Sequence, residues 1–307
     1  MAHAHHDHAG HAHGPRIGSG KAFAIGVALN TAFVAVEAVF GLLADSLALL
    51  ADAAHNLSDV LGLLLAWGAA SLARRAPNER FTYGLRGSTI MAAVANAALL
   101  MLACGAIAWE AVGRFGRAEP PSGALIIWVA LVGAVVNAAT AALFLRDRKR
   151  DLNVRGAYLH MVADAAVSLG VALAGVAILA TGLAWIDPVV SLTVVAVIVL
   201  ATWGLLRDSL RLSLHAVPGD VELPAVRGYL ASLPGVTEVH DLHIWAMSTT
   251  ETALTAHIVM PTGHPGDAFL NELCRTLYTR YGIHHVTVQI EMGDAGVVCE
   301  LAPEHRV

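Results

Sequence analysis

Charged residues are scarce in this chain of 307 residues: only 14% are Asp, Glu, Lys or Arg, whereas 56% are hydrophobic. A soluble domain usually has about a quarter of its residues charged, so the composition excludes an ordinary soluble protein and indicates a membrane protein. Basic residues are also few, since 19 Lys and Arg stand against 24 Asp and Glu. A nucleic-acid-binding protein needs a basic face, and this balance predicts no nucleic-acid partner.

Cysteine is nearly absent, and Cys104, Cys274 and Cys299 are scattered without any Cys-x-x-Cys spacing. This pattern predicts neither a disulfide framework nor a thiolate zinc site. Histidine is abundant by contrast, with 16 in all and six within the first thirteen residues. We interpret residues 1–20 as a disordered His-rich tail that binds metal weakly, and its polar character predicts no cleavable signal peptide.

Long apolar runs are present, and six have about the 20 residues that a helix needs to cross a bilayer. The predicted spans are Ala22–Leu43, Leu47–Ala73, Thr89–Val112, Leu125–Phe144, Val154–Ala180 and Pro188–Leu206. Thirteen Lys and Arg flank the spans on one side, and only Arg114 and Arg117 flank them on the other. Because cytoplasmic loops carry the excess of cations, both termini are predicted to face the cytoplasm.

The pattern changes after Pro218-Gly219 to that of a small soluble domain. Helix, strand, strand, helix and strand are predicted in turn, at Glu222–Leu233, Val236–Met247, Thr252–Met260, Asp267–Tyr281 and His285–Glu291. We therefore expect a six-helix transmembrane bundle with a cytoplasmic α+β domain of ferredoxin-like form. The predicted parts are the His-rich tail 1–20, the transmembrane domain 21–212, the cytoplasmic domain 213–293 and a flexible C-terminal tail 294–307.

Two of the predicted spans contain a histidine four residues before an aspartate, in "HNLSD" and "HMVAD". On a helix this spacing places both side chains on one face, so each span offers an imidazole and a carboxylate. The four residues are His55, Asp59, His160 and Asp164. Four N and O ligands suit tetrahedral Zn²⁺, and the lack of nearby thiolates disfavours Cu(I). Charge inside a bilayer costs from about 2.5 kcal/mol upward and is usually functional.

One Zn²⁺ neutralises two carboxylates, and so do two protons, but an empty pocket keeps both charges. Metal and protons therefore compete for the same ligands, and the histidines extend this competition to physiological pH. The competition predicts a transporter that exchanges metal for protons. Asp52 lies three residues before His55, and we expect it either to support the ligands from behind or to line the entry to them.

Three other functions also use metal ligands inside a membrane. An intramembrane metalloprotease needs His-Glu-x-x-His, and the sequence has no such run. A membrane metal sensor that does not transport is a second alternative. An exporter with a broader preference for Cd²⁺, Co²⁺ or Ni²⁺ is the third, because N and O ligands accept all of these ions.

The runs "SLALLADAAHNLSD", "HMVAD" and, in the tail, "VHDLHIWAMS" resemble the cation diffusion facilitator family, and more narrowly its bacterial zinc exporters. The resemblance implies a homodimer in the bacterial inner membrane that exports Zn²⁺ from the cytoplasm in exchange for protons by alternating access. Such a protein is a secondary transporter and not an enzyme. The resemblance also implies that the four intramembrane residues hold the transported metal, and that His240, His257 and Glu291 are candidate ligands of a regulatory metal site.

The chain departs from the family at three places. The loop "PNERFTYGLR" has no histidine, so the extra metal site of some members is expected to be missing. Arg86-Gly87-Ser88 stands where the family tends to have Arg-x-Glu, and we consider Asp208 as an alternative partner of Arg86. Gln289 stands where some members have another histidine, which leaves the number of cytoplasmic ligands open.

Overall fold

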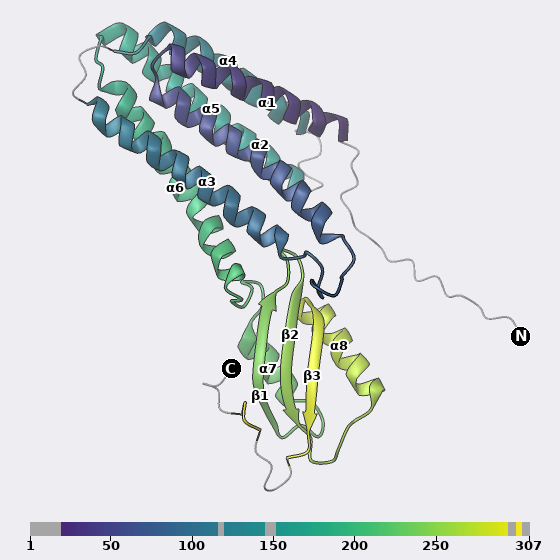
Figure 1. Ribbon diagram of the computed structural model, residues 1–307. Helices are drawn as coiled ribbons and strands as arrows, with labels where there is room; N and C mark the ends of the chain where they lie inside the picture. Colours follow the sequence, from purple (N-terminus) through teal and green to yellow (C-terminus); the bar gives the residue numbers. More distant parts are fainter. Residues whose placement is uncertain (1–19, 116–119, 145–151, 294–298, 303–307) are drawn as a thin grey trace, which may run out of the picture. The chain divides into compact units, whose positions relative to one another are not determined.

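The computed structural model describes residues 20–115, 120–144, 152–293 and 299–302. The predicted His-rich tail, apart from Gly20, and most of the predicted C-terminal tail lie outside these residues. Six long helices come first (Figure 1): α1 (Gly20–Leu43), α2 (Leu47–Ala73), α3 (Ser88–Arg114), α4 (Gly123–Phe144), α5 (Leu152–Thr181) and α6 (Ile186–Ser213). They lie where the sequence predicts the six spans.

Four apolar stretches within the described residues are long enough to cross a membrane. They are Ser88–Arg114, Gly123–Ala142, Met161–Thr181 and Ile186–Ser213. A shorter apolar stretch, Thr31–Leu43, lies in α1. The helical membrane domain predicted from composition is thus confirmed, while six as the number of spans stays a prediction.

The chain divides into two units, and the division passes through α2, α3 and α6. The first unit consists of Met1–Asn56 and Ala111–Ser191, and the second of Leu57–Glu110 and Leu192–Val307. The first therefore contains α1, α4, α5 and the start of α2. The second contains most of α3 and α6 together with the soluble domain.

In the first unit, two glycines bring α4 and α5 into unusually close contact. A Cβ atom added at Gly123 would lie 2.8 Å from the carbonyl oxygen of Gly175, and one added at Gly175 would lie 3.1 Å from that of Gly123. Small residues at such crossings let the backbones of membrane helices approach closely. This contact fixes one end of α5, the helix that carries Asp164.

The start of α2 is fixed by a buried acid from another helix. Asp187, in the first turn of α6, accepts hydrogen bonds from Leu47 N at 2.9 Å and from Ser46 Oγ at 2.5 Å. Its carboxylate satisfies backbone N–H groups that the first turn of a helix leaves without partners. Asp187 is thus a helix cap, and the sequence pattern does not single it out for this role.

The soluble domain in the second unit has the predicted order of elements. It comprises α7 (Leu223–Ala231), β1 (Glu238–Ala246), β2 (Thr252–Val259), α8 (Asp267–Tyr281) and β3 (Ile283–Glu291). The sheet order is β1-β2-β3, with β1 and β2 antiparallel and β2 and β3 parallel. Helices α7 and α8 cover one face of the sheet (Figure 1). Between sheet and helices lies a core that includes Leu230, Leu254, Ile258, Leu273 and Leu277.

The register of the strands places ligand residues together at one end of this sheet. His240 on β1 lies opposite His257 on β2, and Glu291 on β3 lies opposite Val259, two residues after His257. Residues two apart in a strand point to the same face of the sheet. Val259, which lies opposite Glu291, is therefore on the same face as His257. The pairing also shifts register between His240 and His243, where Asp241 has a positive φ of 47°.

Candidate metal centres

Two of the four predicted intramembrane ligands approach each other in the first unit. His55 Nε2, on α2, lies 3.4 Å from Asp164 Oδ1, on α5. Asp164 is buried, with 3% of its surface exposed, and His55 is partly buried. An imidazole and a carboxylate from separate helices thus meet inside the membrane domain.

The other two residues are positioned by the same helices. Asp59 follows His55 by one turn on α2, and this spacing puts both residues on one face of the helix. His160 precedes Asp164 by one turn on α5, but its side chain is outside the described part of the chain. Within the first unit, two of the predicted ligands, His55 and Asp164, are therefore close enough to share one cation.

Further buried acids lie next to this pair. Ser168 Oγ, one turn after Asp164 on α5, donates a hydrogen bond of 3.0 Å to Asp52 Oδ2. Asn56 Nδ2 donates one of 3.2 Å to Glu37 Oε2 on α1. Asp52 therefore links α2 to α5 just beside the predicted ligands, which fits the supporting role expected for it.

The predicted cytoplasmic ligands also come together. Glu291 lies between two imidazoles, with Oε2 at 3.4 Å from His240 Nε2 and Oε1 at 3.0 Å from His257 Nδ1. The rings of His240 and His257 are 5.3 Å apart between centroids. The strand register explains this arrangement, because it holds the histidines opposite each other and the carboxylate on the neighbouring strand.

Two neighbours of this cluster were missed by sequence reasoning. Cys299 Sγ lies 3.5 Å from His257 Nδ1, and ligand atoms of His240, His257, Glu291 and Cys299 lie within 4.8 Å of one another. Asp241 Oδ2 lies 3.4 Å from the other ring nitrogen of His257, Nε2. The spacing rule that set Cys299 aside considers only cysteines close in sequence, and the fold brings this one to the histidines.

Hydrogen bonds and charge shift the pKa values of two groups in this cluster. Partial burial by itself raises the pKa of Glu291, but hydrogen bonds with Cys299 and Gln289 and the charges of the two histidines hold it below its usual range. A backbone hydrogen bond with Leu301 lowers the pKa of Cys299, yet burial and the Glu291 carboxylate raise it above the usual value for a thiol. A metal ion bound here would therefore have to displace the thiol proton.

Arg86 contacts the soluble domain and not Asp208. Its Nη1 lies 2.8 Å from Glu251 Oε2, in the turn between β1 and β2, whereas Asp208 pairs with the adjacent Arg207 at 3.0 Å. Thr249 N in the same turn donates a hydrogen bond of 3.0 Å to Thr89 Oγ1 on α3. The pairing of Arg86 with Asp208 was thus predicted wrongly, since the sequence does not show where this turn docks.

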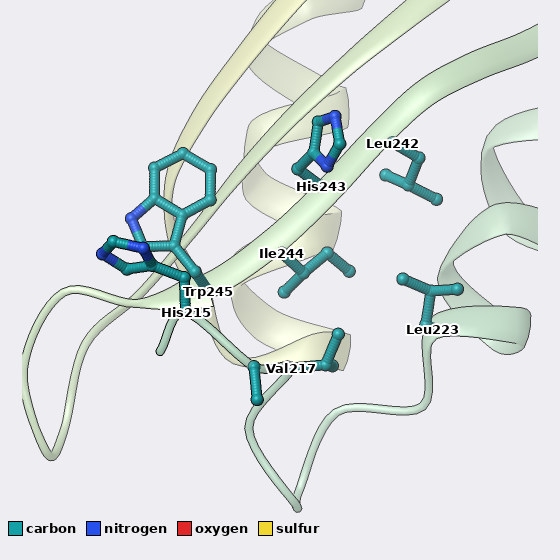
Figure 2. Close-up of a pocket in the computed structure, with 8 residues that line it drawn as sticks. His215, Val217, Leu223, Leu242, His243, Ile244 and Trp245 are labelled. Carbon is teal, nitrogen blue, oxygen red and sulfur yellow. The ribbon is translucent and has the colours of Figure 1, made fainter. Parts of the chain in front are cut away.

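A separate hollow of about 620 Å³ lies along β1, and Figure 2 shows the residues that line it. Its lining is mainly apolar, with Leu223, Leu242, Ile244 and Trp245 beside His215 and His243. His243 Nε2 also lies 2.8 Å from Asp241 Oδ1. None of the four clustered residues His240, His257, Glu291 and Cys299 lines this hollow.

Comparison with known proteins identifies both parts of the chain. Residues 23–212 match the model of the cation efflux transmembrane domain, and residues 218–292 match that of the cation efflux protein cytoplasmic domain. The chain belongs to the cation efflux family. The family predicted from the motifs, the cation diffusion facilitators, is confirmed, and so is an integral membrane protein with a cytoplasmic C-terminal domain.

Several family members are similar along nearly their whole length. The metal cation efflux system protein CzcD of Cupriavidus metallidurans is 35% identical, with 92% of this chain and 90% of that protein covered. The zinc transporter ZitB of Escherichia coli is 33% identical, with 95% and 93% covered. A cadmium, cobalt and zinc/H(+)-K(+) antiporter of Bacillus velezensis is 32% identical, with 96% and 97% covered.

A solved structure of the metal-bound C-terminal domain of the C. metallidurans CzcD transporter also matches. It is 39% identical, covers 23% of this chain and 99% of its own, and has a TM-score of 0.22. These relatives are metal efflux proteins by name, so the class of this protein is a cation efflux transporter.

Proposed function

We propose that this protein exports Zn²⁺ from the cytoplasm in exchange for protons, by alternating access. The metal is held by His55, Asp59, His160 and Asp164. The observation that carries this proposal is the approach of His55 Nε2 to Asp164 Oδ1, at 3.4 Å, between two helices of the membrane domain. Two imidazoles and two carboxylates form a donor set suited to tetrahedral Zn²⁺.

Proton exchange follows from the charge of this site. The proposed site contains two carboxylates, those of Asp59 and Asp164, and two ionised carboxylates in a partly desolvated space repel each other. A divalent cation or two protons removes this repulsion, so the site is stable when loaded with either. A transporter that returns without metal is therefore expected to return with protons.

We further propose a homodimer in the bacterial inner membrane with both termini in the cytoplasm. The excess of Lys and Arg on one side of the spans supports this orientation. The match of residues 218–292 to the cytoplasmic domain of the family supports the placement of the C-terminal domain. The bacterial sources of the relatives support the choice of membrane.

A broader metal range is the second candidate. One relative is named a cadmium, cobalt and zinc antiporter, and a site of N and O donors differs little between these ions. Zn²⁺ is the preferred substrate in our proposal because tetrahedral coordination with mixed imidazole and carboxylate ligands is its usual site. Competition between metals in the flux assay separates the two candidates.

We also assign a regulatory metal site to His240, His257 and Glu291 in the cytoplasmic domain. Its support is the separation of 3.0–3.4 Å between the Glu291 oxygens and the two imidazoles. Ligands on three paired strands suit a cation that stays bound while the membrane domain changes conformation.

Zn²⁺ flux into proteoliposomes with an imposed pH gradient tests the transport proposal. The wild type is expected to move Zn²⁺ faster as the gradient increases, and Asp59→Ala and Asp164→Ala are expected to lose this flux. Asp208→Asn is a matched control, because this acid on α6 is exposed and pairs only locally with Arg207. Flux that ignores the gradient would overturn proton exchange, and metal binding without flux would favour a sensor.

A further inference from the structure

We propose that Cys299 is the fourth ligand of the cytoplasmic metal site. Two imidazoles, one carboxylate and one thiolate would then bind a borderline-soft divalent cation such as Zn²⁺ or Cd²⁺. This inference rests on the proposed metal binding by the cytoplasmic domain. It adds a thiolate ligand that the sequence pattern does not predict, and with it a preference for softer metal ions.

The distances suit a single tetrahedral ion. Metal–ligand bonds of about 2.0–2.3 Å place neighbouring ligand atoms of a tetrahedron about 3.3–3.8 Å apart. Cys299 Sγ lies 3.5 Å from His257 Nδ1, and Glu291 Oε2 lies 3.4 Å from His240 Nε2. All four groups have a ligand atom within 4.8 Å of the others, so only small movements are needed to enclose one cation.

His240 points independently to a ligand at this place. Its side chain is 5% exposed, and neither ring nitrogen has a hydrogen-bond partner within the part of the chain that the structure describes. The nearest carboxylate oxygens, on Glu238 and Glu291, lie 3.3 and 3.4 Å away but outside hydrogen-bond geometry. Buried polar groups are nearly always satisfied, and a cation bound by Nε2 would satisfy this one.

Each histidine also has a carboxylate behind it. His257 directs Nδ1 at Glu291 and Cys299, while its Nε2 lies 3.4 Å from Asp241 Oδ2. The Nδ1 of His240 lies near Glu238. A ligating histidine usually gives its other N–H to a carboxylate, which fixes the tautomer and orients the ring. Asp241 and Glu238 are therefore placed to take this role for His257 and His240, respectively, once each ring turns its outer N–H into hydrogen-bond geometry.

The Cys299 thiolate would give the cytoplasmic site a different metal preference from that of the membrane site, whose proposed ligands are imidazoles and carboxylates. Soft thiolates favour Zn²⁺ and ions of similar softness, whereas oxygen ligands suit Mg²⁺ and Mn²⁺. A site with Cys299 is therefore expected to bind Zn²⁺ or Cd²⁺ while rejecting the abundant Mg²⁺. Binding releases the thiol proton, since only the thiolate is a ligand.

The chain offers matched controls for a test in the full-length protein in detergent. Co²⁺ is the probe, because a cobalt–thiolate bond gives a charge-transfer absorption that imidazole and carboxylate ligands lack. The background is Asp59→Ala with Asp164→Ala, which disables the membrane site. The absorption is expected in this background and with Cys274→Ser, an exposed cysteine on α8. It is expected to vanish with Cys299→Ser and with His257→Ala.

A second measurement needs no variant and is therefore independent of folding defects. Zn²⁺ at ten or more times its Kd is expected to slow alkylation of Cys299 in the wild type by roughly tenfold or more, because only about a tenth of the thiol or less then stays free of metal. Cys274 should be alkylated at the same rate with and without Zn²⁺. An unprotected Cys299, or cobalt–thiolate absorption that survives Cys299→Ser, overturns the proposal. Neither result affects the proton-driven flux that tests the transport proposal.

Discussion

The membrane site and the cytoplasmic site use similar side chains but are held in different ways. His55 and Asp164 meet between two helices that are far apart in the sequence. His240, His257 and Glu291 are carried on three neighbouring strands whose backbone pairing fixes their register. Helices can tilt against each other without breaking their own hydrogen bonds, whereas strands in a sheet cannot. The first arrangement suits a metal that must be released, and the second suits one that stays.

The ligand types of the two sites also favour release of the metal from the membrane site and retention of the metal in the cytoplasmic site. The proposed membrane ligands are imidazoles and carboxylates, which form bonds of moderate strength with Zn²⁺, whereas the cytoplasmic cluster has Cys299 within reach. A thiolate binds Zn²⁺ more tightly than a carboxylate does. Tight binding would slow a transporter, because each cycle ends with release of the metal.

The largest predicted effect separates the two sites directly. His55→Ala removes a proposed ligand of the transported ion and is expected to lower Zn²⁺ flux in proteoliposomes by about a hundredfold. His257→Ala is the matched change in the cytoplasmic site and should leave maximal flux within about twofold, because this histidine lies outside the membrane domain. A loss of flux as large in His257→Ala as in His55→Ala would contradict the division of roles.

A smaller effect concerns the choice of metal. His55→Asp replaces an imidazole with a carboxylate at the membrane site, and oxygen ligands favour harder ions such as Mn²⁺. The ratio of Zn²⁺ to Mn²⁺ flux is expected to fall by about tenfold, as measured by competition in proteoliposomes. The cytoplasmic variant His240→Asp serves as the control, and an equal change of the ratio there would contradict a membrane origin of selectivity.

Asp187 is a buried acid that caps a helix and is not among the proposed metal ligands. Asp187→Ala removes the cap of α2 and is expected to lower the free energy of unfolding by about 0.5–2 kcal/mol. Asp187→Asn should retain most of the stability, since Asn caps helices nearly as well as Asp. Thermal unfolding in detergent measures both. A large loss of metal binding in folded Asp187→Asn would show that this carboxylate is more than a cap.

The smallest predicted effect lies at the junction of α3 with the cytoplasmic domain. The pair Arg86–Glu251 is partly exposed, and such pairs contribute about 0.2–1 kcal/mol. A double-mutant cycle with Arg86→Ala and Glu251→Ala should therefore give a coupling of this size in thermal unfolding. The corresponding cycle with Arg86→Ala and Asp208→Ala should give none, because Asp208 pairs with Arg207.

The fold was predictable from the sequence because its signals are local. Apolar runs of sufficient length gave the helices, and alternating β-branched residues gave the strands, with β1 expected at Val236–Met247 and found at Glu238–Ala246. Glycine and proline marked the turns, and α8 ends at Gly282, which has a positive φ of 67°. Such signals depend only on neighbours in the chain.

The sites were only partly predictable because they depend on contacts between distant residues. The spacing of His55 and Asp59 can be read from one helix, and ligand type and charge predicted a site shared with the second pair. The approach of His55 to Asp164 within 3.4 Å, however, is a contact between helices that only the structure shows. Cys299 follows β3 by eight residues, and no spacing rule relates it to His240 or His257. Arg86 was given the wrong partner for the same reason, since the position of Glu251 depends on how a turn docks.

The contact between Gly123 and Gly175 has a consequence for metal release. Gly175 lies three helical turns from Asp164 on α5, or roughly 16 Å along the axis. If the crowded crossing serves as the pivot of α5, a tilt of about 5° there displaces the carboxylate by about 1.4 Å. Metal–ligand distances tolerate only about 0.2 Å of error, so this rotation is enough to open the cation's coordination shell without unwinding any helix.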